Sequence, residues 1–434
     1  MKYINLSILV LLLLAINACT IDDQADPNGP SINSVLNNAS RAELNLLVSG
    51  TEAAMREGWD GYVTAVGSIA REMYLFDADP RNTEDLLGKE GTPLDANTFY
   101  LTGPYNTRYR VVKNCNLLLQ ALDNTSSVSE AEKDGYRAFA NTIKGLMLFQ
   151  VLNMLNDNGI RVDVADPKNL GPFVTKAEAF TAIRNLLDEG YSQLNGAGFA
   201  FTLSTGFAGF DTPTTFGEFN RALAAKVALY AGDNAAALTH LNNSFFDING
   251  DLKTGPKHVF STASGDILNP VYKAPGQSGD QIIVHNYYLA DAEAGDDRLA
   301  KFGLRVNPTS QDGLNGTHET RLYATNVSPI DIIRNEELIL IYAEASARTD
   351  KVNDALTAIN RIRIEHGLNP FQGTPTADAL LDDVLFQRRY SFWSEGQYMF
   401  DLRRFGRLNA TFLPIDRPGD IIHTQFPIPL TEGQ

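Results

Sequence analysis

The sequence predicts a mostly α-helical protein, built from degenerate tetratricopeptide-type helix pairs with a loop-rich ligand-binding portion. Three observations predict this fold class. Apolar residues recur at a 3.6-residue period in several segments, two distant helical hairpins resemble each other, and long irregular stretches rich in aromatic residues separate the helical blocks. The chain has 434 residues, 44% of them hydrophobic, and can therefore bury a substantial core.

The first 18 residues have the pattern of an export signal. Lys2 precedes the apolar run Ile8–Ile16, which is too short to cross a hydrocarbon core of roughly 20 apolar residues. The run ends in Ile-Asn-Ala-Cys, which resembles the bacterial lipobox. We therefore predict a signal peptide at residues 1–18 and an acylated Cys19, which would anchor the chain in a membrane. The alternative is a plain secretory signal that leaves Cys19 unmodified.

Residues 19–37 are predicted to form a flexible tether, because the composition from Asp22 onward is polar with proline and glycine. Asp22, Asp23 and Asp26 resemble the acidic signal that sends lipoproteins of Bacteroidetes-type bacteria to the outer face of the outer membrane. A merely solvated tether is the alternative, and both can hold. The folded part is then expected at residues 38–434.

Charge and cysteine content narrow the function classes. The formal net charge of −16 argues against nucleic acid as a partner, because a polyanion needs a basic surface. It also disfavours an anionic ligand unless a local basic patch exists. If Cys19 is acylated, Cys115 is the one thiol left, so we expect no internal disulfide and a buried Cys115.

Amphipathic helices follow one another along the chain. Residues 111–122 place apolar side chains on one face, and residues 136–150 and 176–194 repeat the pattern. Two later hairpins, from Leu229 and from Ile341, both carry Tyr-Ala, a polar break, and then a helix containing Ala-Leu-Thr-x-x-Asn. Small residues facing larger ones across a helical hairpin are typical of tetratricopeptide stacking. Chance similarity of two amphipathic hairpins is the alternative.

Four irregular stretches separate the helical blocks. Loops of this length are uncommon in a compact chain unless they are functional or disordered, and their aromatic content argues against disorder. They are therefore the places to look for a ligand site. The stretches are Asp77–Tyr109, Asn156–Thr175, Asn195–Phe219 and Phe245–Pro329.

Catalytic and metal-binding motifs are not found. The sequence has no Gly-x-Ser-x-Gly, His-Glu-x-x-His, phosphate-binding glycine loop or Cys-x-x-Cys, and its six histidines show no ligand spacing. Asp247, Asn249 and Asp251 start like a calcium loop, but Leu252 and His258 stand where an EF-hand needs glycine and glutamate. We predict no cofactor, with a loose structural calcium site left open. Paired carboxylates such as Asp77 and Asp79 could in principle serve a glycosidase.

Motifs in the C-terminal third occur in a characteristic order. They are Arg334 and Glu337 ahead of Tyr342-Ala343-Glu344-Ala345, then Asn360-x-x-Arg363, Arg388 to Glu395-Gly396, Asp401-Leu402-Arg403-Arg404, and Ile428-Pro429. In this order they resemble the SusD/RagB family of outer-membrane nutrient-binding lipoproteins. The upstream segments Tyr109–Asn116, Asn220–Asp233 and Asp297-Arg298 fit the family as well. The resemblance covers nearly the whole mature chain, although Gln387 stands where an acidic residue is commoner.

The resemblance implies a function as well as a SusD-like fold. It implies a cell-surface lipoprotein without enzymatic activity, held in the outer membrane by a lipid anchor and facing the exterior. Such a protein binds an oligosaccharide or polysaccharide and delivers it to a SusC-like TonB-dependent transporter, here through the helical-repeat face. Three alternatives stay open: a RagB-like peptide-binding lipoprotein, a surface glycoside hydrolase, and a tetratricopeptide adaptor without a small ligand.

A glycan site needs flat aromatic faces and short polar side chains, carried on loops over a rigid scaffold. Two regions qualify. They match the ligand-contacting loops of the family by their place in the chain and not by a shared motif. For each tyrosine, packing within the loop is the alternative. In contrast, we predict that Arg388, Glu395, Asp401 and their neighbours form structural ion pairs and that Trp393 lies in the core. The candidate ligand contacts are Asp77, Asp79, Arg81, Asn82, Phe99, Tyr100, Tyr105 and Asn106 in the first region, and Tyr287, Tyr288 and the downstream Tyr323 in the second.

Overall fold

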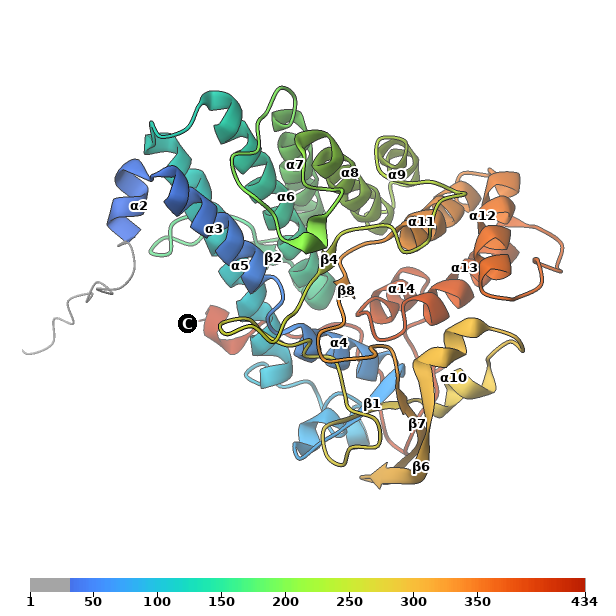
Figure 1. Cartoon of the computed structure of the whole chain (residues 1–434). Helices are drawn as coiled ribbons and strands as arrows, with labels where there is room; N and C mark the ends of the chain where they lie inside the picture. Colours follow the sequence, from blue (N-terminus) through green and yellow to red (C-terminus); the bar gives the residue numbers. More distant parts are fainter. Residues whose placement is uncertain (1–31, 434) are drawn as a thin grey trace, which may run out of the picture.

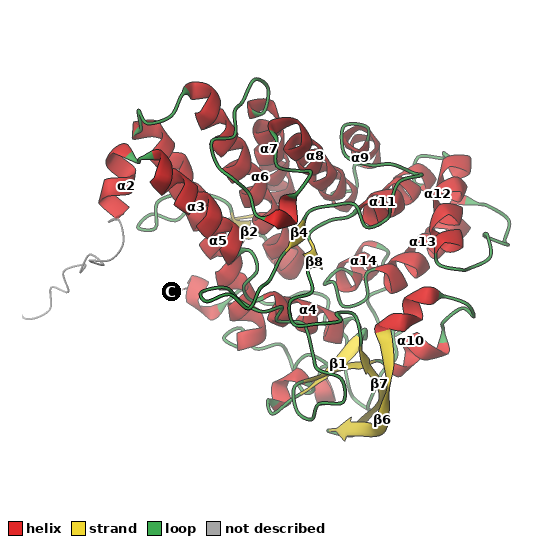
Figure 2. Cartoon of the chain, in the orientation of Figure 1, coloured by secondary structure: helices red, strands yellow, loops and turns green. Residues whose placement is uncertain are grey.

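The computed structural model describes residues 32–433, and it is mostly helical, as predicted (Figures 1 and 2). The predicted signal peptide (residues 1–18) and Cys19 lie outside the described residues. Within residues 32–433, no helix is both long enough and apolar enough to span a membrane. The helices are α2 (Ile32–Asn38), α3 (Arg41–Ala54), α4 (Trp59–Ile69), α5 (Phe99–Asn124), α6 (Glu130–Leu155), α7 (Lys176–Gln193), α8 (Pro213–Tyr230), α9 (Asn234–Leu241), α10 (Asn286–Ala290), α11 (Asn335–Ala347), α12 (Val352–Glu365), α13 (Ala377–Ser391) and α14 (Tyr398–Arg404).

Helices from α5 to α12 stack one on the next. Each of α5 to α8 packs on its successor, α9 packs on α11, and α11 packs on α12, which gives the arc of helices across the top of Figure 1. The two hairpins that resemble each other in sequence are α8–α9 and α11–α12, and they are neighbours in this stack. The predicted pairing of helices is therefore confirmed. Cys115 is buried inside α5, as predicted.

The start of several helices is fixed by local side-chain hydrogen bonds. Ser129 accepts a hydrogen bond from the Glu132 backbone N–H, and the Glu132 carboxylate accepts one from the Ser129 N–H. The same capping box opens α3 and α7. These bonds satisfy helix N–H groups that have no partner within the helix.

Helix α2 begins inside the segment predicted as a tether. Residues 32–37 of the predicted tether (residues 19–37) form most of this helix. Its C-terminal end is held to the end of α5, because Asn124 Nδ2 donates to the Leu36 carbonyl and Thr125 Oγ1 to the Ala39 carbonyl. These tertiary contacts hold the end of α2 against the end of α5.

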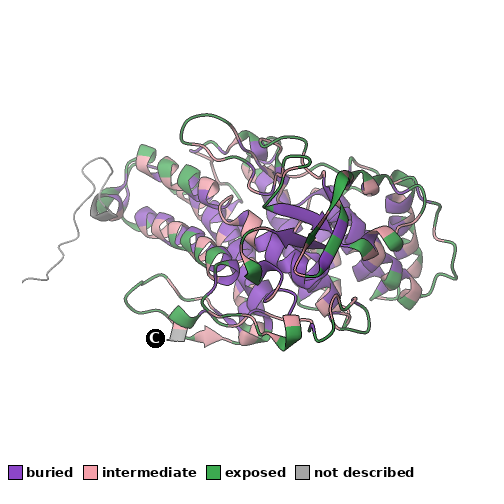
Figure 3. Ribbon diagram, turned by 90° about the horizontal axis from the view of Figure 1, so that it is seen from below, coloured by how far each residue is buried: buried purple, intermediate pink, exposed green. Residues whose placement is uncertain are grey.

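A four-stranded sheet lies below the helices in Figure 1, in the order β1-β5-β7-β6. Strand β1 pairs antiparallel with β5, so that Met73 faces Val284 and Phe76 faces Gln281. In the view of Figure 3, buried strands lie in the middle and an exposed strand crosses in front of them; β6 is largely exposed. The strands are β1 (Met73–Phe76), β5 (Gln281–Val284), β6 (Phe302–Gln311) and β7 (Leu314–Thr320), with short pairs of β2 (Ile160–Arg161) and β3 (Phe173–Val174), and of β4 (Lys257–His258) and β8 (Ile330–Asp331).

All four predicted irregular stretches contain some regular structure. Strands β5, β6 and β7 lie within Phe245–Pro329, and the last third of Asp77–Tyr109 belongs to α5, so these two predictions are wrong there. The short pair β2 and β3 lies in Asn156–Thr175, and α8 begins within Asn195–Phe219. The Gly103-Pro104 pair is typical of a helix end, but Pro104 is buried near the start of α5 and lies against Gly61 of α4. A proline at this depth removes one backbone hydrogen bond, which the packing offsets.

The C-terminal motif residues are structural, as predicted. Trp393 is fully buried, and its Nε1 donates to the Glu72 carbonyl at 2.9 Å. Arg388 is also buried, and its Nε lies 2.7 Å from Asp401 Oδ2. Arg334 Nη1 lies 2.6 Å from Glu395 Oε2. These pairs join α11, α13 and α14 into one block above the sheet.

Candidate functional site

The first predicted ligand region is the segment 77–98 between β1 and α5. It includes the short 3₁₀ helices η1 (Pro80–Asn82) and η2 (Lys89–Gly91). The C-terminal segment holds it in place, since Arg417 Nη2 donates to the Thr83 carbonyl and the Ile421 N–H to the Gly88 carbonyl. Gly88 has φ +65°, and a Cβ there would lie 2.7 Å from the Ile421 oxygen. Only glycine fits this close approach.

A buried hub fixes the scaffold beneath this loop. The Asp416 carboxylate accepts hydrogen bonds from Tyr74 Oη at 2.6 Å and His285 Nε2 at 2.7 Å, and pairs with Arg71 Nε at 2.8 Å. Burial by itself would raise the pKa of Asp416, but His285, Arg71 and Tyr74 together lower it. The ionised Asp416 therefore ties the C-terminal segment to β1 and to the end of β5.

Four of the predicted residues lie on an exposed surface, which we call the Phe99 patch: Asp79, Arg81, Phe99 and Asn106. Arg81 binds Asp79 through two nitrogens, at 2.9 and 2.6 Å, and its guanidinium lies 5.0 Å from the Phe99 ring centroid. The Phe99 side chain is 41% exposed. Asn106 is exposed and seven residues further along α5, which places it on the same helix face. The hydrogen bonds from Arg81 lower the pKa of Asp79, so this carboxylate is ionised.

The other residues of the first region are engaged by neighbouring protein groups and do not form part of the exposed patch. Asn82 Nδ2 donates to both carboxylate oxygens of Asp77, at 3.0 Å each. Tyr100 and Tyr105 are buried; Tyr100 Oη donates to Asp85 and Tyr105 Oη to Glu432. The packing alternative thus applies to both tyrosines.

The second predicted region lies away from the Phe99 patch. Because β1 and β5 are antiparallel, residues after Val284 lie beside the start of β1, whereas segment 77–98 leaves its end. Tyr288 is buried, and Tyr287 is half-buried under the guanidinium of Arg389, 3.8 Å from its ring centroid. Arg389 in turn pairs with Asp291. These two tyrosines therefore pack α10 against α13.

Tyr323, the last predicted residue, lines a cavity of about 640 Å³. We call it the Tyr323 cavity, and it lies between the 3₁₀ helix η5 (Asp297–Lys301), the segment after β7, β8, the start of α11 and the end of α12. Its lining includes Lys253, Asp297, Lys301, Arg334 and His366. The predicted contacts thus fall into separate places instead of one site.

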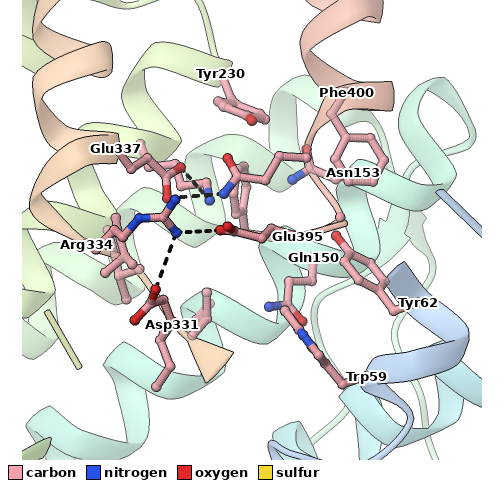
Figure 4. Close-up of a pocket in the computed structure, with 18 residues that line it drawn as sticks. Trp59, Tyr62, Gln150, Asn153, Tyr230, Asp331, Arg334, Glu337, Glu395 and Phe400 are labelled. Carbon is pink, nitrogen blue, oxygen red and sulfur yellow. Dashed lines mark hydrogen bonds and ion pairs between the residues drawn. The ribbon is translucent and has the colours of Figure 1, made fainter. Parts of the chain in front are cut away.

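Figure 4 shows a second cavity, deep between the helices and β8, of about 40 Å³. Trp59, Tyr62, Tyr230 and Phe400 line it, and Arg334 extends between Asp331 and Glu395. Aromatic and polar side chains also suit a sugar, but this space holds about three water molecules and no sugar ring. Its carboxylates are paired: Glu337 with Lys226 at 2.7 Å and Glu395 with Arg334. Sequence reasoning did not single out this cavity, because its residues come from five distant segments.

In the acidic stretch that starts like a calcium loop, backbone N–H groups of the same stretch donate hydrogen bonds to the carboxylates. Asp247 accepts a hydrogen bond from the Asn249 N–H, and Asp251 accepts one from the Lys253 N–H, both at 2.9 Å. Within residues 32–433, no group of three or more His, Cys, Asp or Glu side chains is arranged to hold a metal ion.

Glu72, next to Trp393, gives a pH-dependent prediction. It is fully buried, and burial raises the pKa of its carboxyl to about 8, although a hydrogen bond from the Ser394 N–H lowers it. Between about pH 5 and 8 the Glu72 carboxyl keeps its proton in the folded protein. In the unfolded chain it has lost the proton, because the pKa of an unfolded glutamate is about 4.3. The free energy of unfolding should therefore fall as pH rises from about 5 to 8, by at most ~1.4 kcal/mol per pH unit from this group.

Glu72→Gln should remove that dependence and be more stable than wild type at pH 8. Urea unfolding at pH 5, 6, 7 and 8 measures this, with Glu189→Gln on the exposed face of α7 as the matched control. A Glu72→Gln protein with the wild-type pH profile would contradict the buried, protonated state.

Comparisons with known proteins agree with this architecture. A model of the SusD family matches residues 287–429. A search of curated proteins finds no match. A SusD superfamily protein from Bacteroides vulgatus has a TM-score of 0.68 at 16% identity, over 91% of this chain and 96% of that one. Surface glycan-binding protein A from Bacteroides thetaiotaomicron has 0.71 at 15%, over 91% and 96%, and its complex with laminarihexaose has 0.70 at 14%, over 91% and 97%.

The sequence match and the fold are independent observations with one result. The family match covers the stretch that holds the C-terminal motifs, from Arg334 to Pro429. The shared fold covers nine-tenths of the chain, including the helix stack and the sheet. Residues 287–429 therefore match the SusD family, and the fold over nine-tenths of the chain is SusD-like.

Proposed function

We propose that this protein binds an oligosaccharide or polysaccharide through the Phe99 patch. The observation that carries this proposal is the exposed Phe99 ring beside the Arg81–Asp79 pair, on a loop that a buried hub holds rigid. An aromatic face suits the C–H face of a sugar ring, and the carboxylate, guanidinium and amide groups can bond its hydroxyls. Glycan-binding proteins of the same fold, one holding laminarihexaose, support this ligand class.

The charge of the patch favours a neutral glycan. Asp79 neutralises Arg81, and the whole chain carries a formal net charge of −16. A uronate or sulfate polymer would therefore meet no free cation at Arg81 and a repulsive overall field.

The rest of the proposed function concerns the cell surface. An acylated Cys19 would hold the protein in the outer membrane, facing the exterior, and the bound glycan would pass to a SusC-like TonB-dependent transporter. We propose no catalytic activity, because Asp77 and Asp79 are each engaged by Asn82 or Arg81. Reducing ends that accumulate when the pure protein is incubated with a polysaccharide would instead favour the glycoside hydrolase alternative.

Phe99→Ala should weaken glycan binding about 10- to 100-fold, because the variant loses the stacking face at the centre of the patch. Native affinity gels with laminarin, xyloglucan, starch, mannan and xylan give the measurement. Tyr191→Ala is the matched control, since Tyr191 is a similarly exposed aromatic residue on α7, outside the patch. If Phe99→Ala and Tyr191→Ala are retained equally by every polysaccharide that slows the wild type, the Phe99 patch does not bind the glycan.

A peptide is the second candidate ligand, and one observation favours it. Strand β6 is an edge strand on which Leu304 is 70% and Val306 97% exposed. An extended peptide can add a strand to such an edge. Binding of peptides, with no polysaccharide retained, would favour the RagB-like alternative.

A further inference from the structure

We propose that the Tyr323 cavity is a second saccharide-binding site, separate from the Phe99 patch. This inference rests on the proposed function, because its ligand is a further stretch of the same neutral glycan. Neither Phe99 nor Arg81 lines this cavity, and Tyr323 does not belong to the patch. The two places would therefore act as two contact points for one chain.

The size and lining of the cavity suit a sugar. Its volume, about 640 Å³, lies within the roughly 300–1,000 Å³ typical of small-molecule sites. Tyr323 supplies an aromatic ring at its wall, and Lys253 and Asp297 supply exposed polar groups. This combination of one aromatic face with hydroxyl-binding groups is the one that the Phe99 patch also presents.

The floor of the cavity is rigid, because its cations are bound by neighbouring groups. Arg334 lies 2.8 Å from Glu336 and 2.6 Å from Glu395, and its Nη2 donates to the Ser391 carbonyl at 2.8 Å. Lys301 Nζ donates to the backbone carbonyls of Tyr390 and Ser391. Groups held in this way are preorganised and lose little freedom when a ligand binds.

The charges that line the cavity nearly balance. His366 Nδ1 lies 2.7 Å from Asp297 and its Nε2 3.0 Å from Glu336, so the imidazole lies between two of the carboxylates. Apart from His366, five cationic side chains and six carboxylates line the cavity. Such a surface selects neither an anion nor a cation, and it offers donors and acceptors to a neutral, hydroxyl-rich ligand.

The hairpin β6–β7 sets the distance between the two sites. Its tip lies beside the loop of the Phe99 patch, because Gln311 Nε2 donates to the Asp77 carbonyl at 2.9 Å. Strand β7 runs away from the tip for seven residues and ends at Thr320, three residues before Tyr323. At about 3.4 Å per residue, the tip of the hairpin and Thr320 lie on the order of 20 Å apart. One sugar unit cannot reach both sites, but a polysaccharide can, and two contacts on one chain raise its overall affinity.

The experiment compares variants of each site on the same polysaccharides. We expect Tyr323→Ala to weaken retention about 3- to 10-fold in affinity gels. The gels contain laminarin, xyloglucan, starch, mannan or xylan, and the comparison uses those polysaccharides that slow the wild type. Phe99→Ala should leave a residual retention that the Phe99→Ala/Tyr323→Ala double variant loses. Lys253→Ala, whose side chain is exposed at the cavity, should act in the same direction as Tyr323→Ala, and it decides the result if Tyr323→Ala unfolds at a lower temperature than wild type.

Three outcomes separate the two proposals. If the wild type is retained, and Tyr323→Ala and Lys253→Ala are each retained as strongly as the Tyr191→Ala control, the second site alone is overturned. Complete loss of retention in Phe99→Ala by itself also overturns the second site and leaves the proposed function standing. No retention of the wild type by any of the five polysaccharides overturns the proposed function and the second site with it.

Discussion

Arg388→Ala is expected to lower the free energy of unfolding by about 3–5 kcal/mol. Arg388 is buried; its Nε binds Asp401 at 2.7 Å, and its Nη2 binds Gln397 Oε1 at 3.0 Å and lies 3.9 Å from Glu337. Removing the guanidinium leaves Glu337 and Asp401 buried with fewer compensating groups. The cost comes mainly from the carboxylates left behind and less from the attraction that is lost.

Urea unfolding at pH 7 measures this loss, and Arg407→Ala is its matched control. Arg407 pairs with Asp382 at the surface, and losing an exposed pair costs at most ~1 kcal/mol. If both variants lost the same small amount, the buried network would not be a stabilising element.

The same variant should change the acid stability. Burial by itself would raise the pKa of Asp401, but Arg388 and Arg404 lower it. A folded-state pKa below the unfolded value gives stability above about pH 4, and that stability is lost as the pH falls through the folded-state value. Arg388→Ala removes part of this contribution, so the difference between wild type and variant should narrow in acid.

Trp393→Ala is expected to cost a similar amount, about 3–5 kcal/mol, by opening a cavity in the core. The ring is fully buried and meets the Phe302 ring edge to face, with 4.9 Å between centroids. Its Nε1 donates to the Glu72 carbonyl, which the variant leaves without that donor. Because Glu72 precedes β1 and Phe302 begins β6, Trp393 joins both outer strands of the sheet to the helical block.

Thermal and urea unfolding test this prediction, with Phe412→Ala as the control. Phe412 is an exposed aromatic residue of the C-terminal segment, and its removal should change stability by about 0.5 kcal/mol or less. Trp393→Phe should fall between the two, since it keeps a ring and loses the hydrogen bond. A Trp393→Ala protein as stable as Phe412→Ala would contradict the role of Trp393 in the core.

The helical part of the fold could be predicted from the sequence, and the sheet could not. The helices carry their own signal, because apolar residues at a 3.6-residue period appear within one segment. Strand β5 is four residues long and pairs with β1, more than 200 residues earlier. A strand this short has no local pattern that separates it from a loop, and only its partner makes it a strand.

The candidate site also has a part that the sequence predicts and a part that it does not. Phe99, Arg81 and Asp79 lie together because they are near in the chain, and the sequence pointed to all three. The burial of Tyr105 and Tyr288, and the position of Tyr323 in a separate cavity, depend on contacts with distant segments such as Glu432 and Tyr390. No spacing within one loop encodes such contacts.

The sequence by itself determined the mostly helical class, the helix pairs, the structural role of Arg388 and Trp393, and the resemblance to the SusD family. These depend on residue type and local period, which a single segment carries. Only the tertiary structure decided which aromatic residues reach the surface and where cavities form. A side chain's exposure is set by whatever packs over it, and for Tyr105 the covering group, Glu432, comes from the other end of the chain.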